Sequence, residues 1–354
     1  MSIYEPTVTG VLQINNRRGK LQEHNLEIPP GLVTEFNLRT GDTITGYSRQ
    51  GKLYKIKKIN GLSPTDSQKL VRFENLLPAH PTQRILLEDG SLEMRILDLI
   101  APIARGQRAI VVAPPKSGKT ILLKKIAQTI IKNKDLHLMA LLVMERPEEL
   151  LDFQDIEGLE LFASTFDQTN QHHVTISRTA IEKAKRLVEQ GKDVVLLLDS
   201  LTRLTRACNV LTPSHGKLLS GGLDASALQF PKELFGSARN IKGNNGSLTI
   251  IATCLSETDS KLDDAILTEF CGTGNSDVIL SREIADKKLY PAIDVKKSGT
   301  RRDELMLHPD EKIKMDKLRS ILSNCAPHEA IQFLRQKLGT YKTNAEFLMN
   351  LNGI

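Results

Sequence analysis

The segment from Ala113 to Thr120 has the residue types and spacing of a phosphate-binding loop. Successive backbone N–H groups of such a loop surround the β-phosphate of a nucleotide. Lys119 can reach the β- and γ-phosphates, and the Thr120 hydroxyl can hold Mg²⁺. The strict pattern begins with glycine, where this chain has alanine, so the alternative is a chance Gly-Lys-Thr at a strand–helix turn. The loop reads Ala113, Pro114, Pro115, Lys116, Ser117, Gly118, Lys119 and Thr120.

Two acidic residues end other apolar runs and extend the candidate site. Asp199 ends the run 194–198, and a carboxylate there can hold a Mg²⁺ shell through water. Glu145 follows the run 138–143 and could orient or deprotonate an attacking water. Ligands of parallel sheets bind at the carboxyl ends of strands, which favours these roles. The alternatives are a helix cap for Asp199 and a helix N-terminal acid for Glu145.

Hydrolysis of a triphosphate also requires positive charge near the developing transition state. Arg203 and Arg206 follow the strand that ends in Asp199, and Arg301 and Arg302 follow a Ser-Gly-Thr segment. Any of these could instead be a solvated surface arginine, and the pattern alone does not choose among them.

The elements that would position these residues alternate between apolar strands and amphipathic helices. Strands without polar alternation, separated by helices, predict an α/β fold whose parallel sheet is covered on both faces. The tail, about 311–354, predicts two or three helices with Pro327 between them. The expected strands are 109–112, 138–143, 194–198 and 248–252, and the expected helices are 120–132 and 179–189.

The first 61 residues differ from the rest of the chain. Strand-like runs at 8–12, 42–47 and 53–56, punctuated by glycine, predict a small β-barrel, with a linker at 62–67. These 61 residues hold nine Lys and Arg against five acids, in a chain whose net charge is +6. Such a basic patch either attracts polyanions or forms a solvated face.

Composition limits the class of protein. The 354 residues suit one large and one or two small domains. No apolar run reaches the ~18 residues of a membrane helix, and the N-terminus has no signal pattern, so a cytoplasmic location is expected. The four cysteines lack metal-binding spacing and are expected to be reduced.

From about Phe73 to Leu305 the chain resembles the bacterial transcription termination factor Rho family, as a divergent and N-terminally shortened member. In that family alanine replaces the first glycine of the phosphate loop. The resemblance implies a RecA-like P-loop ATPase domain at 66–308, an OB-type barrel at 1–65 and a helical segment at 309–354. The matching strings occur in the family's order, at 100–120, 141–150, 164–167, 196–207, 216–228, 247–253, 270–275, 291–305 and 341–347.

The resemblance also implies roles for single residues. Ala113 to Thr120 and Arg146 would bind ATP, and an aromatic ring, here Tyr290, would lie on adenine. The implied catalytic residues are Lys119, Glu145 as the base, Asp199 as the Walker B acid and Arg301 as a finger given to the next subunit, with Arg203 near that shared interface. Thr120 and Asp199 would hold Mg²⁺. The implied RNA contacts are Lys217, Gly221, Gly222 and Lys261 in the channel loops and Arg18 and Lys20 on the barrel.

The implied function is an ATP-dependent, RNA-stimulated translocase and helicase that releases transcripts from RNA polymerase. Its cofactors would be ATP and Mg²⁺, and its partners single-stranded RNA, five further copies in a hexamer and RNA polymerase, with no membrane. Two alternatives stay open: an RNA-binding ring ATPase with weak or no translocation, and a related ring that acts on a protein.

Departures from the family motivate those alternatives. The barrel strand that usually carries two stacking aromatics reads Asn16 to Leu21, so Arg18 and Lys20 could substitute only by charge and guanidinium stacking. Tyr54 could be a surviving stacking ring, but a half-buried strand tyrosine is the expected interpretation. The phosphate loop, Glu145, Asp199 and Arg301 are unchanged, which predicts retained ATP hydrolysis with altered RNA coupling. The substituted motor positions are Met144, Gln229, Phe230, Glu233, Asp259, Cys271 and Lys288.

Overall fold

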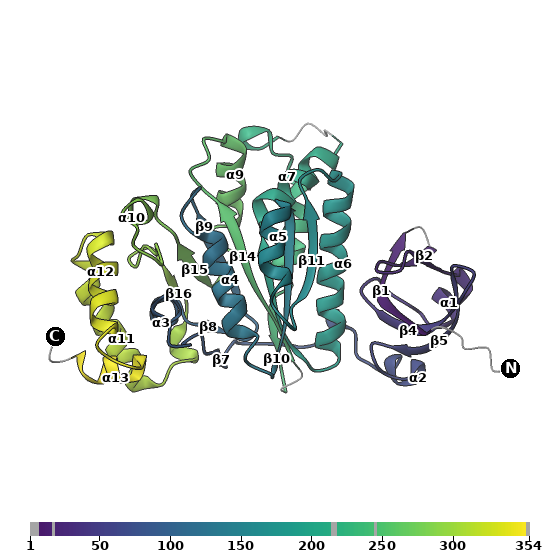
Figure 1. Ribbon diagram of the computed structural model, residues 1–354, viewed down its shortest axis with the longest axis horizontal. Helices are drawn as coiled ribbons and strands as arrows, with labels where there is room; N and C mark the ends of the chain where they lie inside the picture. The colour runs from purple at the N-terminus through teal and green to yellow at the C-terminus, as the bar shows by residue number, and fades with distance from the viewer. Residues whose placement is uncertain (1–6, 16–17, 214–217, 244–245, 352–354) are drawn as a thin grey trace.

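The computed structural model describes residues 7–15, 18–213, 218–243 and 246–351 (Figure 1). Its N-terminal part is a closed barrel with strand order β1-β2-β3-β5-β4, in which one helix connects β3 to β4. Leu12, Leu21, Ile44 and Leu53 are fully buried in the barrel core. The predicted OB-type barrel is confirmed. Its elements are β1 Thr7–Asn15, β2 Arg18–Leu21, β3 Leu26–Ile28, α1 Pro30–Glu35, β4 Thr43–Arg49 and β5 Lys52–Ile59.

The barrel is fixed to helix α6 (Asn170–Glu189) by a buried carboxylate. Both oxygens of Glu189 accept hydrogen bonds from the Arg39 guanidinium, at 3.0 and 2.6 Å. Glu189 also accepts from the backbone N–H of Phe73, at 2.9 Å, in the segment that leaves the barrel. Gly41 lies so close to α6 that a Cβ there would be 2.4 Å from the Glu182 carbonyl carbon. The barrel is therefore held on α6 both by this close backbone contact and by the ion pair between Arg39 and Glu189.

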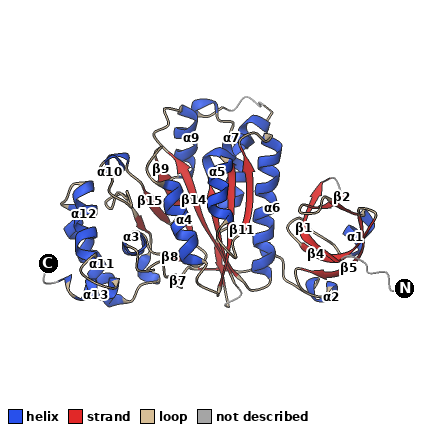
Figure 2. Cartoon of the chain, viewed as in Figure 1, coloured by secondary structure: helices blue, strands red, loops and turns tan. Residues whose placement is uncertain are grey.

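The larger part of the chain is built on a mostly parallel sheet with order β11-β10-β12-β14-β9-β15-β16 (Figure 2). Short β13 (Arg239–Ile241) extends it through β14 and pairs β6 (Pro78–Ala79). A separate two-stranded sheet joins β7 (Arg84–Ile85) to β8 (Ile103–Ala104). The principal strands are β9 Arg108–Ala113, β10 Leu136–Glu145, β11 Glu160–Thr165, β12 Asp193–Asp199, β14 Ser247–Leu255, β15 Ser276–Ile279 and β16 Gly299–Thr300.

Helices cover both faces of this sheet, because successive apolar residues of each strand point to opposite sides. On β9, Ala109 and Val111 join one buried core, and Ile110 and Val112 join the other. The predicted RecA-like α/β fold is confirmed. The first core packs on α3 Leu92–Ile100, α4 Lys119–Ile130, α5 Pro147–Gln154, α11 Pro309–Ser323, α12 Pro327–Leu338 and α13 Asn344–Met349, and the second on α6, α7 Leu201–Leu211, α8 Gln229–Gly236 and α9 Lys261–Phe270.

Several element boundaries differ from the sequence-based expectations. The helix expected at 179–189 begins at Asn170, where the Thr169 side chain caps it by accepting from the His172 N–H. Its first turns carry polar residues, which hid them from an apolar pattern. The expected linker contains one helical turn, α2 (Pro64–Ser67). Pro327 is the first residue of α12, a position that needs no N–H.

The remaining described elements are the short helix α10 Arg282–Asp286 and the 3₁₀ turns η1 Phe73–Asn75, η2 Ser220–Gly222, η3 Ala225–Leu228 and η4 Asp303–Leu305. Across the described residues, none of the helices has the length and apolarity needed to cross a membrane.

Candidate nucleotide-binding and hydrolysis site

The predicted phosphate loop connects β9 to α4, which begins at Lys119. Lys116 and Gly118 have positive φ angles of 64° and 87°, so the loop turns sharply before the helix starts. The Ser117 hydroxyl stabilises the turn by donating to the Pro114 carbonyl oxygen at 2.7 Å. A Cβ on Gly118 would be 3.1 Å from the Tyr290 ring, so glycine permits this close approach. The loop thus presents the N-terminus of α4 to any anion above it.

Lys119 joins the two acidic residues that the sequence placed at strand ends. Its ammonium donates to both carboxylate oxygens of Asp199 and lies 3.4 Å from Glu145 Oε1. Asp199 and Glu145 are each 1% exposed. The structure therefore brings three predicted residues together at the carboxyl ends of β9, β10 and β12.

Glu145 has the environment of a general base. Burial, followed by the negative charge of Asp199, raises its pKa, whereas Lys119 and Arg203 lower it. The Arg203 guanidinium pairs with Oε1. Oε2 is buried and, among the described residues, has no hydrogen-bond partner. An acceptor oxygen of this kind can take a proton from a water held beside it.

The backbone before Glu145 is irregular. The pairing of β10 with β11 shifts register between Leu142 and Glu145, and Met144 has a left-handed φ of 56°. The Met144 carbonyl oxygen accepts from the Arg203 guanidinium at 2.9 Å. Such irregularities redirect side chains at functional sites. Here the irregularity lies where Glu145 turns toward Lys119.

Thr120 and Asp199, the residues predicted to hold Mg²⁺, have suitable oxygens, and in this structure those oxygens form hydrogen bonds with protein groups. Asp199 accepts from the Thr253 hydroxyl at 2.7 Å, and Thr120 donates to Glu149 Oε2 at 3.1 Å. No group of three or more His, Cys, Asp or Glu suited to a metal occurs in the described part of the chain. Mg²⁺ commonly takes only one or two protein oxygens and completes its shell with phosphate and water. A hydroxyl and a buried carboxylate beside a phosphate loop fit that requirement.

A cavity of about 630 Å³ opens above the loop. Arg146 and Tyr290, which the resemblance assigned to ATP, line it together with the loop, and so does Arg203, which the resemblance assigned to the interface between subunits. Tyr290 also borders a smaller apolar hollow of about 170 Å³ that contains Ile121 and Leu280. Drug-sized ligands occupy pockets of roughly 300–1,000 Å³, so the larger cavity has the volume for a nucleoside triphosphate.

Arg301 lies away from this cavity. Its guanidinium is exposed and donates to the Gly272 carbonyl oxygen at 3.3 Å, just beyond α9. Its backbone N–H donates to the Asn275 carbonyl oxygen at 2.9 Å. The residues that line the cavity do not include it.

Among the residues that the structure describes, those of the two predicted channel loops lie close together. Lys217 falls outside the described residues. A Cβ on Gly221 would be 2.4 Å from the Lys261 carbonyl oxygen, so the segment at 220–222 abuts the first residue of α9. Gly222 has a φ of 77°, and Lys261 is exposed.

On the barrel, Arg18 and Lys20 border a hollow of about 430 Å³ that also contains Glu27. Tyr54 is 42% exposed, more than the half-buried position expected for it, and its ring lies 6.4 Å from that of Tyr47.

Sequence reasoning missed several residues of the site. Glu149 accepts a hydrogen bond from Thr120, and Thr253 donates one to Asp199. Thr258 lines the nucleotide cavity. Threonine is common in and after strands for structural reasons, so Thr253 and Thr258 gave no sign of a functional role in the sequence. Only Glu149 gave such a sign, because it lies in the first turn of a helix.

Comparisons with known proteins agree with this geometry. The model of the ATP synthase alpha/beta family, nucleotide-binding domain, matches residues 93–300. The chain is 49% identical over 336 residues to the transcription termination factor Rho of Buchnera aphidicola subsp. Acyrthosiphon pisum, covering 91% of this chain and 80% of that protein. It is 47% identical over 344 residues to that of Aquifex aeolicus, covering 93% and 78%.

Solved structures give the same fold. A prototypical ATPase from the type III secretion system of pathogenic bacteria superposes with a TM-score of 0.62 at 26% identity, covering 70% of each chain. The ATP synthase subunit NeqB of Nanoarcheaum equitans superposes with a TM-score of 0.61 at 19% identity, covering 70% of this chain and 64% of its own.

Proposed function

The chain belongs to the transcription termination factor Rho family, and on that premise we propose that it terminates transcription by hydrolysing ATP at the site between β9, β10 and β12. ATP hydrolysis and termination follow from the family. The further proposals are the roles of single residues, a ring of six copies, single-stranded RNA in the channel and RNA polymerase as the target. Mg²⁺, held by Thr120 and Asp199, would neutralise charge on the β- and γ-phosphates.

One observation supports the hydrolytic role above the others: Glu145 is buried, its Oε1 lies 3.4 Å from Lys119 Nζ, and its Oε2 has no hydrogen-bond partner among the described residues. When ATP enters, the Lys119 ammonium can exchange Asp199 for phosphate oxygens. Asp199 then becomes available to metal-bound water, and Glu145 Oε2 can orient the attacking water. A buried carboxylate oxygen without a partner is costly to a fold, so its presence beside the phosphate loop favours a role in hydrolysis over ATP binding alone.

The ring is supported by the position of Arg301. A finger that is exposed and lies outside its own cavity can reach only the cavity of another copy. Heterologous contacts of that kind close into rings. The RNA role is supported by Lys261, which begins α9 three residues after Thr258 of the cavity.

The test is the ATPase rate with and without single-stranded RNA of varied sequence. We expect strong stimulation by RNA, and a loss of roughly 100-fold or more in kcat for Glu145→Gln and for Lys119→Ala. Lys124→Ala is the matched control, because Lys124 lies on the same helix but pairs with Asp152 at 2.6 Å. Slow turnover that ignores RNA would contradict the motor and favour a ring that only binds RNA.

A further inference from the structure

The smaller hollow beside the phosphate loop, of about 170 Å³, contains an ion pair. Glu93, in the first turn of α3, and Lys125 of α4 both border the hollow, and the Lys125 ammonium lies 2.8 Å from Glu93 Oε2. The Glu93 side chain is 24% exposed and the Lys125 side chain 32% exposed. A ligand in the hollow can therefore reach both charged groups.

This hollow adjoins the nucleotide cavity. Gly118, Ile121 and Tyr290 line both of them. Ile121 and Lys125 are four residues apart on α4 and share one face of the helix, so the hollow follows α4 from the phosphate loop to the ion pair. Ile121 is 61% exposed, although it is apolar. A flat ring that enters beside the loop would cover Ile121 and lie against Tyr290, and its far edge would meet the ion pair.

Glu93 is ionised in these surroundings. Burial alone would raise the pKa of Glu93, whereas the hydrogen bond from the Lys125 ammonium, its own backbone N–H and the charges of Lys125 and Arg335 lower this pKa below its usual value. Arg335, which belongs to α12, also donates to the Tyr290 carbonyl oxygen and so ties α12 to the wall of the hollow. An ionised carboxylate only accepts hydrogen bonds. The far edge of the hollow therefore holds an acceptor that has no proton to donate.

Such an acceptor distinguishes the two purine bases. Adenine carries an amine, a hydrogen-bond donor, at the ring position where guanine carries a carbonyl oxygen, an acceptor. The Glu93 carboxylate can accept from the amine and repels the carbonyl oxygen. Specificity of this kind combines an attraction for one ligand with a repulsion of its competitor.

We propose that Glu93 selects adenine over guanine at this site, by accepting a hydrogen bond from the exocyclic amine of a base that lies between Tyr290 and Ile121. Lys125 would be a positioning residue that holds the carboxylate in place. This inference rests on the proposed function, because it concerns the base of the nucleotide that is hydrolysed there. An ion pair that served only to join α3 to α4 would have no effect on which base binds.

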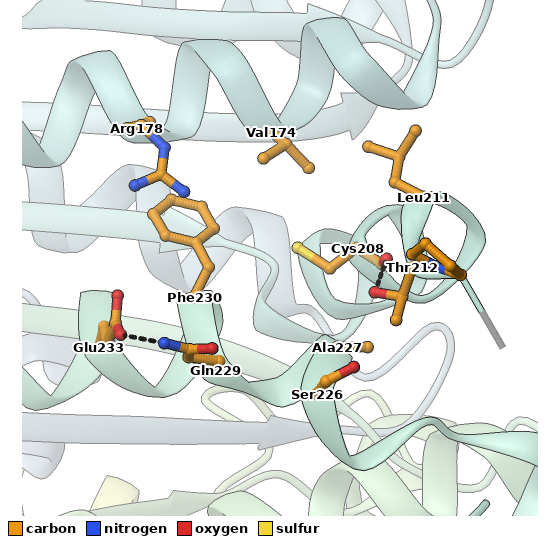
Figure 3. Close-up of a pocket in the computed structure, with 11 residues that line it drawn as sticks. Val174, Arg178, Cys208, Leu211, Thr212, Ser226, Ala227, Gln229, Phe230 and Glu233 are labelled. Atoms are coloured by element: carbon orange, nitrogen blue, oxygen red, sulfur yellow. Dashed lines mark hydrogen bonds between the residues drawn. The ribbon is translucent and has the colours of Figure 1, made fainter. Parts of the chain in front are cut away.

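A larger hollow, of about 550 Å³, lies between α6, α7 and α8 and provides a comparison (Figure 3). It also combines a charge with an aromatic ring, since the Arg178 guanidinium carbon lies 4.3 Å from the centroid of the Phe230 ring. None of the described residues that line it belongs to the phosphate loop. A base in that hollow would have no site for its triphosphate, so a change at Arg178 should leave the base preference unaltered.

The test compares the affinities of non-hydrolysable ATP and GTP analogues, measured with Mg²⁺ by isothermal titration calorimetry. The unmodified chain should bind the ATP analogue about tenfold more tightly than the GTP analogue, or more, because only the adenine amine donates to the charged acceptor. Glu93→Gln should reduce this preference about tenfold, because an amide can turn either its oxygen or its NH₂ group toward the base.

Two control variants should keep the preference of the unmodified chain. Asp152→Asn neutralises the acid of another ion pair on α4, in which Lys124 lies 2.6 Å from Asp152, and that pair borders neither the hollow nor the nucleotide cavity. Arg178→Ala removes the charge from the larger hollow.

Equal affinity of the unmodified chain for both analogues, or an unchanged preference in Glu93→Gln, would overturn the role of Glu93. A chain with either result could still hydrolyse ATP in response to RNA, so the ATPase rate tests the proposed function separately. An unmodified chain that binds neither analogue would reject both proposals.

Discussion

Mixing two inactive variants gives a sharp test of the shared site. Arg301→Ala removes the finger and Lys119→Ala removes the loop lysine, and each protein alone should be nearly inactive. The structure places Arg301 outside the cavity that Lys119 lines. If each site takes its loop from one subunit and its finger from the next, a mixed ring contains some sites with both groups intact.

The expected recovery follows from counting. In rings assembled at random from equal amounts, a loop from an Arg301→Ala subunit meets a finger from a Lys119→Ala subunit at about one quarter of the interfaces. ATPase activity per subunit should therefore rise to about that fraction of the unmodified rate. Native mass spectrometry of the mixture checks that mixed rings formed.

The control mixes Lys119→Ala with Glu145→Gln. Both residues belong to the same half of the site, since Lys119 Nζ lies 3.4 Å from Glu145 Oε1. Every site in that mixture lacks one of them, so no activity should return. Equal, negligible activity in both mixtures would refute a finger supplied by the neighbouring subunit.

Three further outcomes are expected. Gly41→Val should destabilise the barrel's attachment by about 2–5 kcal/mol, because it adds a side chain at φ 87° against the backbone of α6, and proteolysis within 61–72 should report it. Arg203→Gln should move the acidic limb of the kcat–pH profile to higher pH, because it removes a charge that lowers the pKa of Glu145, the group that must be ionised; an unmoved limb would argue against Glu145 as the base. Alanine at both Arg18 and Lys20 should reduce the slope of log K against log salt for single-stranded RNA by about 1.4, and an unchanged slope would exclude them as phosphate contacts.

The centre of the site was predictable because its parts are local or follow from sheet geometry. The phosphate loop is continuous in sequence, and its flanking strand and helix give a periodic signal. Asp199 and Glu145 are far apart in the chain, but residues at the carboxyl ends of parallel strands meet at one edge of a sheet. The fold class and the meeting of Lys119 with both acids followed from those two facts.

The contacts that attach one part to another could not be predicted in this way. Gly41 looked like an ordinary turn residue, yet its lack of a Cβ is what lets the barrel touch α6. Glu189 and Arg39 are 150 residues apart, and no periodicity relates them. Periodic patterns indicate which side of an element is buried, but they do not identify the element that buries it.

The link between nucleotide and the predicted channel depends on contacts of the same kind. Thr258 lines the nucleotide cavity, and its hydroxyl donates at 2.6 Å to the buried Asp263, which also pairs with Arg206. Asp263 lies in the first turn of α9, two residues after Lys261. Gly221 has no room for a side chain against the Lys261 backbone, so α9 cannot shift there without moving the segment at 220–222. A change at Thr258 on nucleotide binding would therefore reach both segments proposed to hold RNA, through the buried Asp263 carboxylate and the packed backbone at Gly221 and Lys261. Because none of these contacts requires the aromatic residues that the barrel lacks, the proposed coupling of hydrolysis to the channel is separable from the strength of RNA binding by the barrel.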